Sequence, residues 1–265
     1  MNLPKSTSWL VLLAAMVLFV ATSGAIAADT PPEAPPVSKF APAKDLAKQV
    51  KYYMKRLEAA VETKEDYKDF VERIAKDSNT LTAIALSLGL HDTDNPYKKS
   101  APAIIKASQE LAAAKDYDAA KAAVANVKKA VDSKSADTAK LKWEKVASLE
   151  QLMLAVPAVN TQLKRNMKLR RPKRDGPKAS GRAAVIAVIG QASLYHSADT
   201  SKPELVKQWY KYCEEMRDAA AEVGDVARRG DKAASRKVMA KLAESCDNCH
   251  KVFHPEAIGK EDAEE

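Results

Sequence analysis

Five residues near the end of the chain, Cys246 to His250, have a spacing that could support redox chemistry. The pattern C-x-x-C-H is typical of covalent haem attachment. Residues three apart share one face of a helix, so both cysteine thiols could reach one edge of a porphyrin. The next residue, His250, would then direct its imidazole towards the iron as the proximal ligand. The sequence therefore predicts one haem c, bound covalently through Cys246 and Cys249.

A C-x-x-C pair can also serve as a redox dithiol or as half of a zinc site. A redox dithiol usually lies near a βαβ pattern, and the sequence contains no strand signal. A zinc site needs a second closely spaced ligand pair, which Cys213 and the remaining histidines do not provide. Three cysteines give no disulfide framework. Cys213 is interpreted as a small buried thiol, with an intermolecular disulfide as the alternative.

Helices are the elements that must position these residues. Alanine is abundant, only 8 of 265 residues are glycine, and aromatic residues make up 6%, so we expect helices around an aliphatic core. Apolar residues recur at spacings of three and four, which place them on one buried helical face. This pattern occurs in eight segments, approximately residues 46–61, 70–88, 104–111, 120–131, 146–163, 183–194, 205–223 and 238–253.

The eight segments predict two tandem four-helix bundles, because four amphipathic helices with short connections form one bundle. The halves are weakly similar, and His91 and His196 occupy matching places at the ends of their second helices. We interpret these two histidines as structural residues at helix ends. The first bundle, residues 42–136, contains no cysteine and is expected to be haem-free. Residues 137–265 form the expected haem-binding bundle.

The N-terminal residues have the features of an export signal. Lys5 precedes an apolar run, and Ala25-Ile26-Ala27 fits a cleavage site, so residues 1–27 are predicted to be a signal peptide. The run is about thirteen residues, shorter than the roughly 20 that a membrane-spanning helix needs. An uncleaved anchor is the alternative. Residues 28–41 are interpreted as a proline-rich linker, and the protein is expected to be periplasmic or otherwise exported and not membrane-spanning.

The segment from Ser245 to Phe253, S-C-D-N-C-H-K-V-F, resembles the C-terminal signature of the cytochrome c′ family, which includes the low-spin cytochromes c-556. The resemblance covers roughly Lys140 to Pro255. It implies a four-helix bundle with C-x-x-C-H on its last helix, and possible homodimers. The chain departs from the family in its extra N-terminal bundle and in a long basic loop between the first two helices of the second bundle.

The resemblance also implies that the first helix of this bundle faces the distal side of the iron. No methionine occurs among the fifteen residues after His250, so a sixth ligand must come from upstream. Met153 is the candidate ligand, with ordinary core packing as the alternative. Leu149 and Val156, one turn to either side, would line the distal pocket. Met167 is the weaker choice of ligand.

The net charge of +8 indicates acidic partners. Its main source is the predicted loop from Lys164 to Lys178, which has eight basic residues against one acid, Asp175. The loop is either a solvated segment or a docking patch for an acidic redox partner. Nucleic acid is not expected as a partner of an exported cytochrome. Anionic lipid headgroups remain open as a partner.

These features predict an exported mono-haem c-type cytochrome that transfers single electrons. The alternative is a five-coordinate, cytochrome c′-like protein that binds nitric oxide or carbon monoxide. A haem enzyme would need a polar distal base or charge stabiliser, and Leu149, Met153 and Val156 provide neither. We therefore expect no enzymatic activity. His254, four residues after the proximal histidine, is a candidate neighbour of the haem edge.

Overall fold

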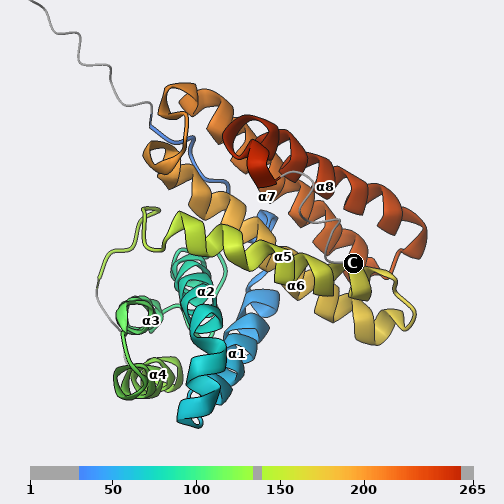
Figure 1. Cartoon of the computed structure of the whole chain (residues 1–265). Coiled ribbons are helices and arrows are strands. Elements are labelled where there is room, and N and C mark those ends of the chain that lie inside the picture. The colour runs from blue at the N-terminus through green and yellow to red at the C-terminus, as the bar shows by residue number, and fades with distance from the viewer. Residues whose placement is uncertain (1–29, 134–138, 258–265) are drawn as a thin grey trace, which may run out of the picture. The chain divides into compact units, whose positions relative to one another are not determined.

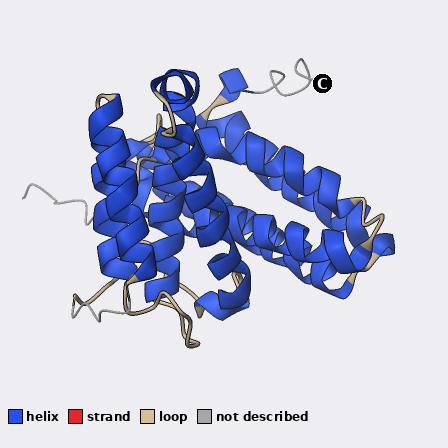
Figure 2. Cartoon of the chain, turned by 90° about the horizontal axis from the view of Figure 1, so that it is seen from below, coloured by secondary structure: helices blue, strands red, loops and turns tan. Residues whose placement is uncertain are grey.

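The periodic apolar segments of the sequence form helices, and no strand occurs in the described residues (Figure 2). The computed structural model describes residues 30–133 and 139–257. Within those residues the α-helices are α1 (Ala43–Ala60), α2 (Lys64–Gly89), α3 (Ala101–Ala113), α4 (Tyr117–Asp132), α5 (Leu149–Met167), α6 (Pro172–Ser193), α7 (Val206–Arg229) and α8 (Lys232–Phe253). Short 3-10 helices are η1 (Val37–Lys39), η2 (Leu194–Asp199), η3 (Pro203–Leu205) and η4 (Pro255–Ala257). The predicted all-α fold class is confirmed.

Polar side chains at the helix N-termini explain where several helices begin. Thr63 and Asp66 form a capping box at α2, in which the Asp66 N–H donates to the Thr63 hydroxyl over 3.0 Å. The side chains of Asp116 and Asp231 each accept a bond from the backbone N–H three residues later, at the starts of α4 and α8. Each cap satisfies a donor that has no partner within the helix. α7 ends at Gly230, whose φ of 67° is the left-handed conformation that glycine adopts readily.

α6 is the central helix of the fold. It packs against α5 and α7, its neighbours in the chain, and also against α1 and α2 from the first half (Figure 1). Every residue from Ala183 to Leu194 is buried. A helix that is apolar on all sides needs neighbours on all sides, which is the position that α6 occupies.

The first four helices and the last four contribute to one continuous hydrophobic core. Polar contacts also join the two halves. The backbone N–H of Ser148 donates to the Asn79 side-chain oxygen over 2.8 Å, and Arg228 forms an ion pair with Asp45 over 2.9 Å. That each half forms a separate bundle stays a prediction, and the predicted boundary between residues 136 and 137 lies outside the described residues.

The proline-rich segment before α1 packs partly on the fold. Residues 30–36 are non-helical, as expected for a linker. The last part of the expected linker, from η1 to Ala41, instead belongs to the core, with Val37, Phe40 and Ala41 buried. The predicted signal peptide lies outside the described residues. No helix within residues 30–133 and 139–257 is both long and apolar enough to cross a membrane.

Candidate functional site

The C-x-x-C-H motif lies in the last two turns of α8. The helix continues without interruption through the motif to Phe253, and the His254 N–H donates to the His250 carbonyl over 2.9 Å. Cys246 and Cys249 therefore lie three residues apart on one helix, as the spacing argument requires. Both cysteines and His250 are half-buried.

An apolar group of side chains surrounds one side of the motif. We call it the motif cluster, and its buried members are Leu194, Trp209, Tyr210, Cys213 and Phe253. Cys249 packs against it, as do Leu149 at the start of α5 and Tyr195 in η2. The Trp209 indole N–H donates to the Ser193 carbonyl over 2.8 Å, and its ring meets Phe253 edge to face at 5.2 Å. These contacts hold the end of α8 against α6 and α7.

The thiol of Cys249 is held in its protonated form. Burial raises the pKa of Cys249 to about 12, and the neighbouring Cys246 and Glu215 act in the same direction. Redox dithiols use a cysteine whose pKa is lowered, so that the thiolate forms near neutral pH. The environment of Cys249 is the opposite of the one that a redox dithiol needs.

Cys213, on α7, belongs to the motif cluster. Its side chain is only 4% exposed and forms no disulfide, and burial raises its pKa well above the usual value. Cys249 contributes further to that increase. This position fits the interpretation of Cys213 as a small buried thiol, and an intermolecular disulfide would require the thiol to reach the surface.

His254 lies beside the proposed proximal ligand. The rings of His250 and His254 are perpendicular, with centroids 5.9 Å apart. His254 is exposed, and its Nδ1 pairs with the Glu256 carboxylate over 2.8 Å. That His254 lies at the haem edge stays a prediction.

The candidate distal residues lie on α5, which packs directly against α8. Leu149, Met153 and Val156 are all half-buried. Leu149 packs against the motif cluster together with Cys249, whereas Met153 and Val156 pack against the main core. The structure therefore brings Leu149 closest to the motif's apolar surroundings, and Met153 follows one turn further along α5.

A proline lies one turn after Met153 in α5. Pro157 has no N–H, so the carbonyl of Met153 has no donor four residues ahead in the helix. The start of α5 is fixed separately, because Ser148 caps it through the Gln151 N–H and donates its own N–H to Asn79. The candidate ligand is thus placed between a fixed helix start and a weakened helical turn.

Met167, the weaker candidate ligand, lies at the other end of α5. It is 3% exposed and packs in the main core. At 1.5 Å per residue, it is roughly 27 Å along the helix from Leu149. This separation leaves Met167 no access to a group bound at the motif.

The two histidines at matching helix ends are buried and hydrogen-bonded. The Nδ1 of His91 accepts the Thr93 N–H over 3.0 Å, so its Nε2–H donates to the Ala41 carbonyl over 3.1 Å. The Nδ1 of His196 lies 2.7 Å from the Asp199 carboxylate. Both residues stabilise the turn that follows a helix, which agrees with their interpretation as structural residues.

The predicted basic loop from Lys164 to Lys178 is mostly helical, which corrects the sequence prediction. Only residues 168–171 separate α5 from α6. Pro172 occupies the first position of α6, where its missing N–H costs nothing. The Asp175 carboxylate accepts the Arg171 N–H over 2.8 Å and so satisfies a backbone donor at the helix start. Several of the basic residues that were predicted to lie in a loop therefore lie in the first turns of a helix.

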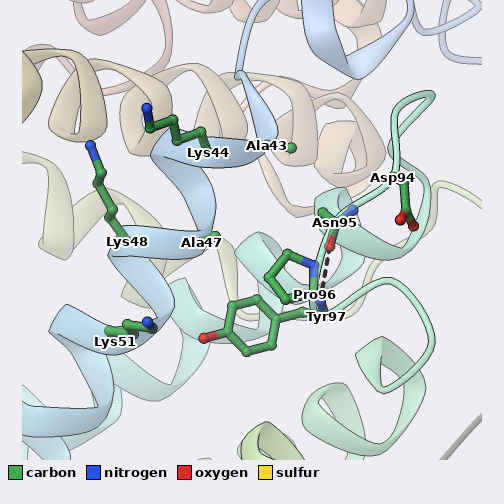
Figure 3. Close-up of a pocket in the computed structure, with 9 residues that line it drawn as sticks. All are labelled: Ala43, Lys44, Ala47, Lys48, Lys51, Asp94, Asn95, Pro96 and Tyr97. Atoms are coloured by element: carbon green, nitrogen blue, oxygen red, sulfur yellow. Dashed lines mark hydrogen bonds between the residues drawn. The ribbon is translucent and has the colours of Figure 1, made fainter. Parts of the chain in front are cut away.

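A row of lysines on α1 was not among the site residues predicted from the sequence. Lys44, Lys48 and Lys51 are exposed at helical spacings of four and three. They rim an open cavity of about 390 Å³, whose opposite wall is formed by Pro96 and Tyr97 (Figure 3). The repeat of lysine at positions i, i+4 and i+7 was the available signal. Asp94 also lines the cavity, so its rim carries charges of both signs.

The donor set at the motif is compatible with a covalently attached haem. Two thiols and one imidazole lie within five residues of α8, and an apolar cluster lies beside them. Within residues 30–133 and 139–257, no three His, Cys, Asp or Glu side chains are grouped to hold a metal ion directly. Comparison of the chain with protein families, with curated proteins and with solved structures finds no match.

Proposed function

We propose that the chain is an exported c-type cytochrome that carries single electrons on one covalently bound haem c. The observation that supports this most strongly is the placement of Cys246 and Cys249 on the last turns of α8, next to His250 and an apolar cluster. The bound haem would supply one-electron redox chemistry, and the protein would supply binding, orientation and surroundings.

Each residue of the motif has a distinct role in this proposal. Cys246 and Cys249 anchor the cofactor through thioether bonds, and His250 provides the proximal imidazole. The motif cluster excludes water from one side of α8. An apolar shell of this kind stabilises the less charged oxidation state and so helps to set the redox potential.

The distal side decides between electron transfer and gas binding. With Met153 as sixth ligand, the site would be low-spin and closed to small gases. A second candidate function, binding of nitric oxide or carbon monoxide, is favoured by the position of Leu149, because this residue and not Met153 packs with Cys249 in the motif cluster. An apolar Leu149 at the distal position would leave the site five-coordinate.

An enzymatic role receives no support from the candidate distal residues. Leu149, Met153 and Val156 offer no proton donor, base or charge to a reacting group. We therefore propose a non-enzymatic carrier, located in the periplasm or otherwise exported, with redox proteins as partners. A homodimer is part of this proposal only through the resemblance to the cytochrome c′ family.

One optical spectrum of the purified protein, oxidised and reduced, tests the proposal and separates its two forms. Sharp reduced α and β bands of a low-spin haem c, unchanged by carbon monoxide, would support electron transfer. A high-spin spectrum that shifts with carbon monoxide would support gas binding. A colourless protein, purified from a host with haem maturation machinery, would contradict both.

A further inference from the structure

The excess positive charge of the chain is concentrated in one short segment. Residues 164–178 contain eight basic residues and one acid, so they hold seven of the chain's eight excess positive charges. All eight basic side chains are exposed. The single acid, Asp175, is buried, and its pKa is lowered by the Arg171 backbone N–H and by the Arg174 guanidinium. The Asp175 carboxylate therefore bonds inside the fold and does not offset the positive charge of the exposed side chains.

The fold adds further basic residues to this segment from a distant part of the sequence. A Cβ on Gly230, in the turn between α7 and α8, would lie 3.1 Å from the Pro172 side chain. The exposed Arg229 and Lys232 flank that turn. We call the combined surface the basic end, and its residues are Lys164, Arg165, Lys168, Arg170, Arg171, Lys173, Arg174, Lys178, Arg229 and Lys232. The connections α5–α6 and α7–α8 lie at the same end of their helices (Figure 1).

Two of these charges are unfavourable for the fold itself. Lys173 and Arg174 lie in the first turn of α6, where the helix dipole is already positive. Basic residues stabilise helix C-termini and destabilise N-termini by a few tenths of a kcal/mol or more. The start of α6 therefore increases the positive potential of the basic end, which favours the binding of anions.

The basic end lacks the features of a specific protein-binding surface. Protein interfaces have an apolar or aromatic centre surrounded by a polar rim. Among the described residues, Val71 and Leu154 are the large hydrophobic side chains that are exposed, and neither belongs to the basic end. Half of its ten residues are arginines, whose planar guanidinium groups match the geometry of phosphate. The surface fits an array of phosphates recognised by charge.

The basic end is also remote from the C-x-x-C-H motif. α8 starts at Lys232, within the basic end, and Cys246 follows 14 residues later. At 1.5 Å per residue, the separation along the helix is roughly 21 Å. A redox partner seated on the basic end would therefore be far from the motif, and a membrane bound there would leave the motif accessible.

We propose that the basic end binds the anionic phosphate headgroups of a membrane surface, and that it does so without insertion of apolar side chains. This interaction is independent of the proposed function, because its test needs no haem. The binding is electrostatic and reversible by salt. The motif end of α8 points away from the bound surface.

The test is co-sedimentation of the exported chain, starting at Ala28, with phospholipid vesicles. Vesicles with about 30% phosphatidylglycerol in phosphatidylcholine should bind the protein at low salt, and pure phosphatidylcholine should not. Binding should disappear at about 1 M salt, where charges are screened beyond about 3 Å. Binding to pure phosphatidylcholine, or binding that survives high salt, would show apolar insertion and overturn the proposal.

Two variants with the same loss of charge locate the surface. The first replaces four residues of the basic end by glutamine and leaves the Arg174–Asp175 pair intact: Lys168, Arg170, Arg171 and Lys173. The control replaces four exposed lysines of the α2–α3 region and of the turns that flank α3: Lys68, Lys99, Lys106 and Lys115. Each basic residue near an anionic surface contributes roughly five-fold to partitioning, so the first variant should bind about 600-fold more weakly.

The control variant should retain most of the vesicle binding. Equal losses in both variants would mean that only net charge matters, which contradicts a defined basic end. A third measurement uses soluble polyglutamate at the same low salt. If polyglutamate competes with the vesicles at equal concentration of negative charge, the surface is a general acidic-polymer site and the membrane proposal is wrong.

Discussion

Replacement of Gly190 by alanine should separate α6 from α7 next to the motif cluster. A Cβ at this position would lie 2.9 Å from the Arg217 nitrogen, 3.0 Å from the Cys213 carbonyl oxygen and 3.2 Å from the Arg217 Cα. All three atoms belong to the α7 backbone, which cannot move without moving the helix. Overpacking of this kind costs about 1–3 kcal/mol. The better helix propensity of alanine offsets about 1 kcal/mol. We expect a net loss of about 1 kcal/mol, up to about 2 kcal/mol if α7 cannot shift.

Gly224→Ala is the matched control, because Gly224 is also a buried glycine within the α6–α7 contact. Its Cβ would meet the flexible Arg228 side chain at 3.3 Å and the Ala183 Cβ at 3.7 Å. The propensity gain should then dominate, and stability should rise by about 0.5–1 kcal/mol. Urea unfolding followed by far-ultraviolet circular dichroism measures both values. Equal unfolding midpoints for the two variants would refute the close α6–α7 packing.

Three further predictions concern the site and the core. Met153→Ala should convert a low-spin haem to a high-spin form that binds carbon monoxide, whereas Met167→Ala should leave the optical spectrum unchanged. A spectrum that changes in Met167→Ala and not in Met153→Ala would contradict the placement of these two residues along α5. In the native protein, the Arg56 guanidinium is about a quarter exposed and lies 2.7 Å from the Asp77 carboxylate. Asp77→Ala removes that partner and should destabilise the protein by about 2–3 kcal/mol in urea unfolding. Burial lowers the pKa of His196 below its usual 6.5, against the opposing effect of Asp199, so the unfolded chain binds more protons near pH 6. Stability should be full above pH 6.5 and fall as the pH decreases below it, and His196→Gln should flatten that part of the stability profile.

The helices could be predicted from the sequence, because each buries a face marked by apolar residues at spacings of three and four. The packing of the two halves against each other could not be predicted from the sequence. An apolar stripe shows that one face of a helix is buried, but it does not show which helix covers that face. One signal was present: residues 183–194 are apolar on almost all sides, and a helix of a simple bundle needs only one apolar face. α6, which contains that segment, contacts helices from both halves.

The motif residues were correctly predicted to lie on the last α-helix. The C-x-x-C-H spacing is set by the sequence alone, and on a helix it places both cysteines on one face. The distal residues were less predictable. Leu149 and Met153 share one helical stripe, and the stripe does not show that only Leu149 packs against the motif cluster. The start of α6 was missed because the run of basic residues from Lys164 to Lys178 was interpreted as a loop, although Pro172 is well tolerated in a first helical turn.

The central claim is covalent haem attachment at Cys246 and Cys249. Its most direct test is a denaturing gel stained for haem peroxidase activity, on protein made in a host with export and haem maturation machinery. We expect a stained band at the mature mass for the native chain and for Cys213→Ala, the matched control within the motif cluster. Joint replacement of Cys246 and Cys249 by alanine should abolish the stain. A native chain without stain, or a stain that survives the double replacement, would contradict the account.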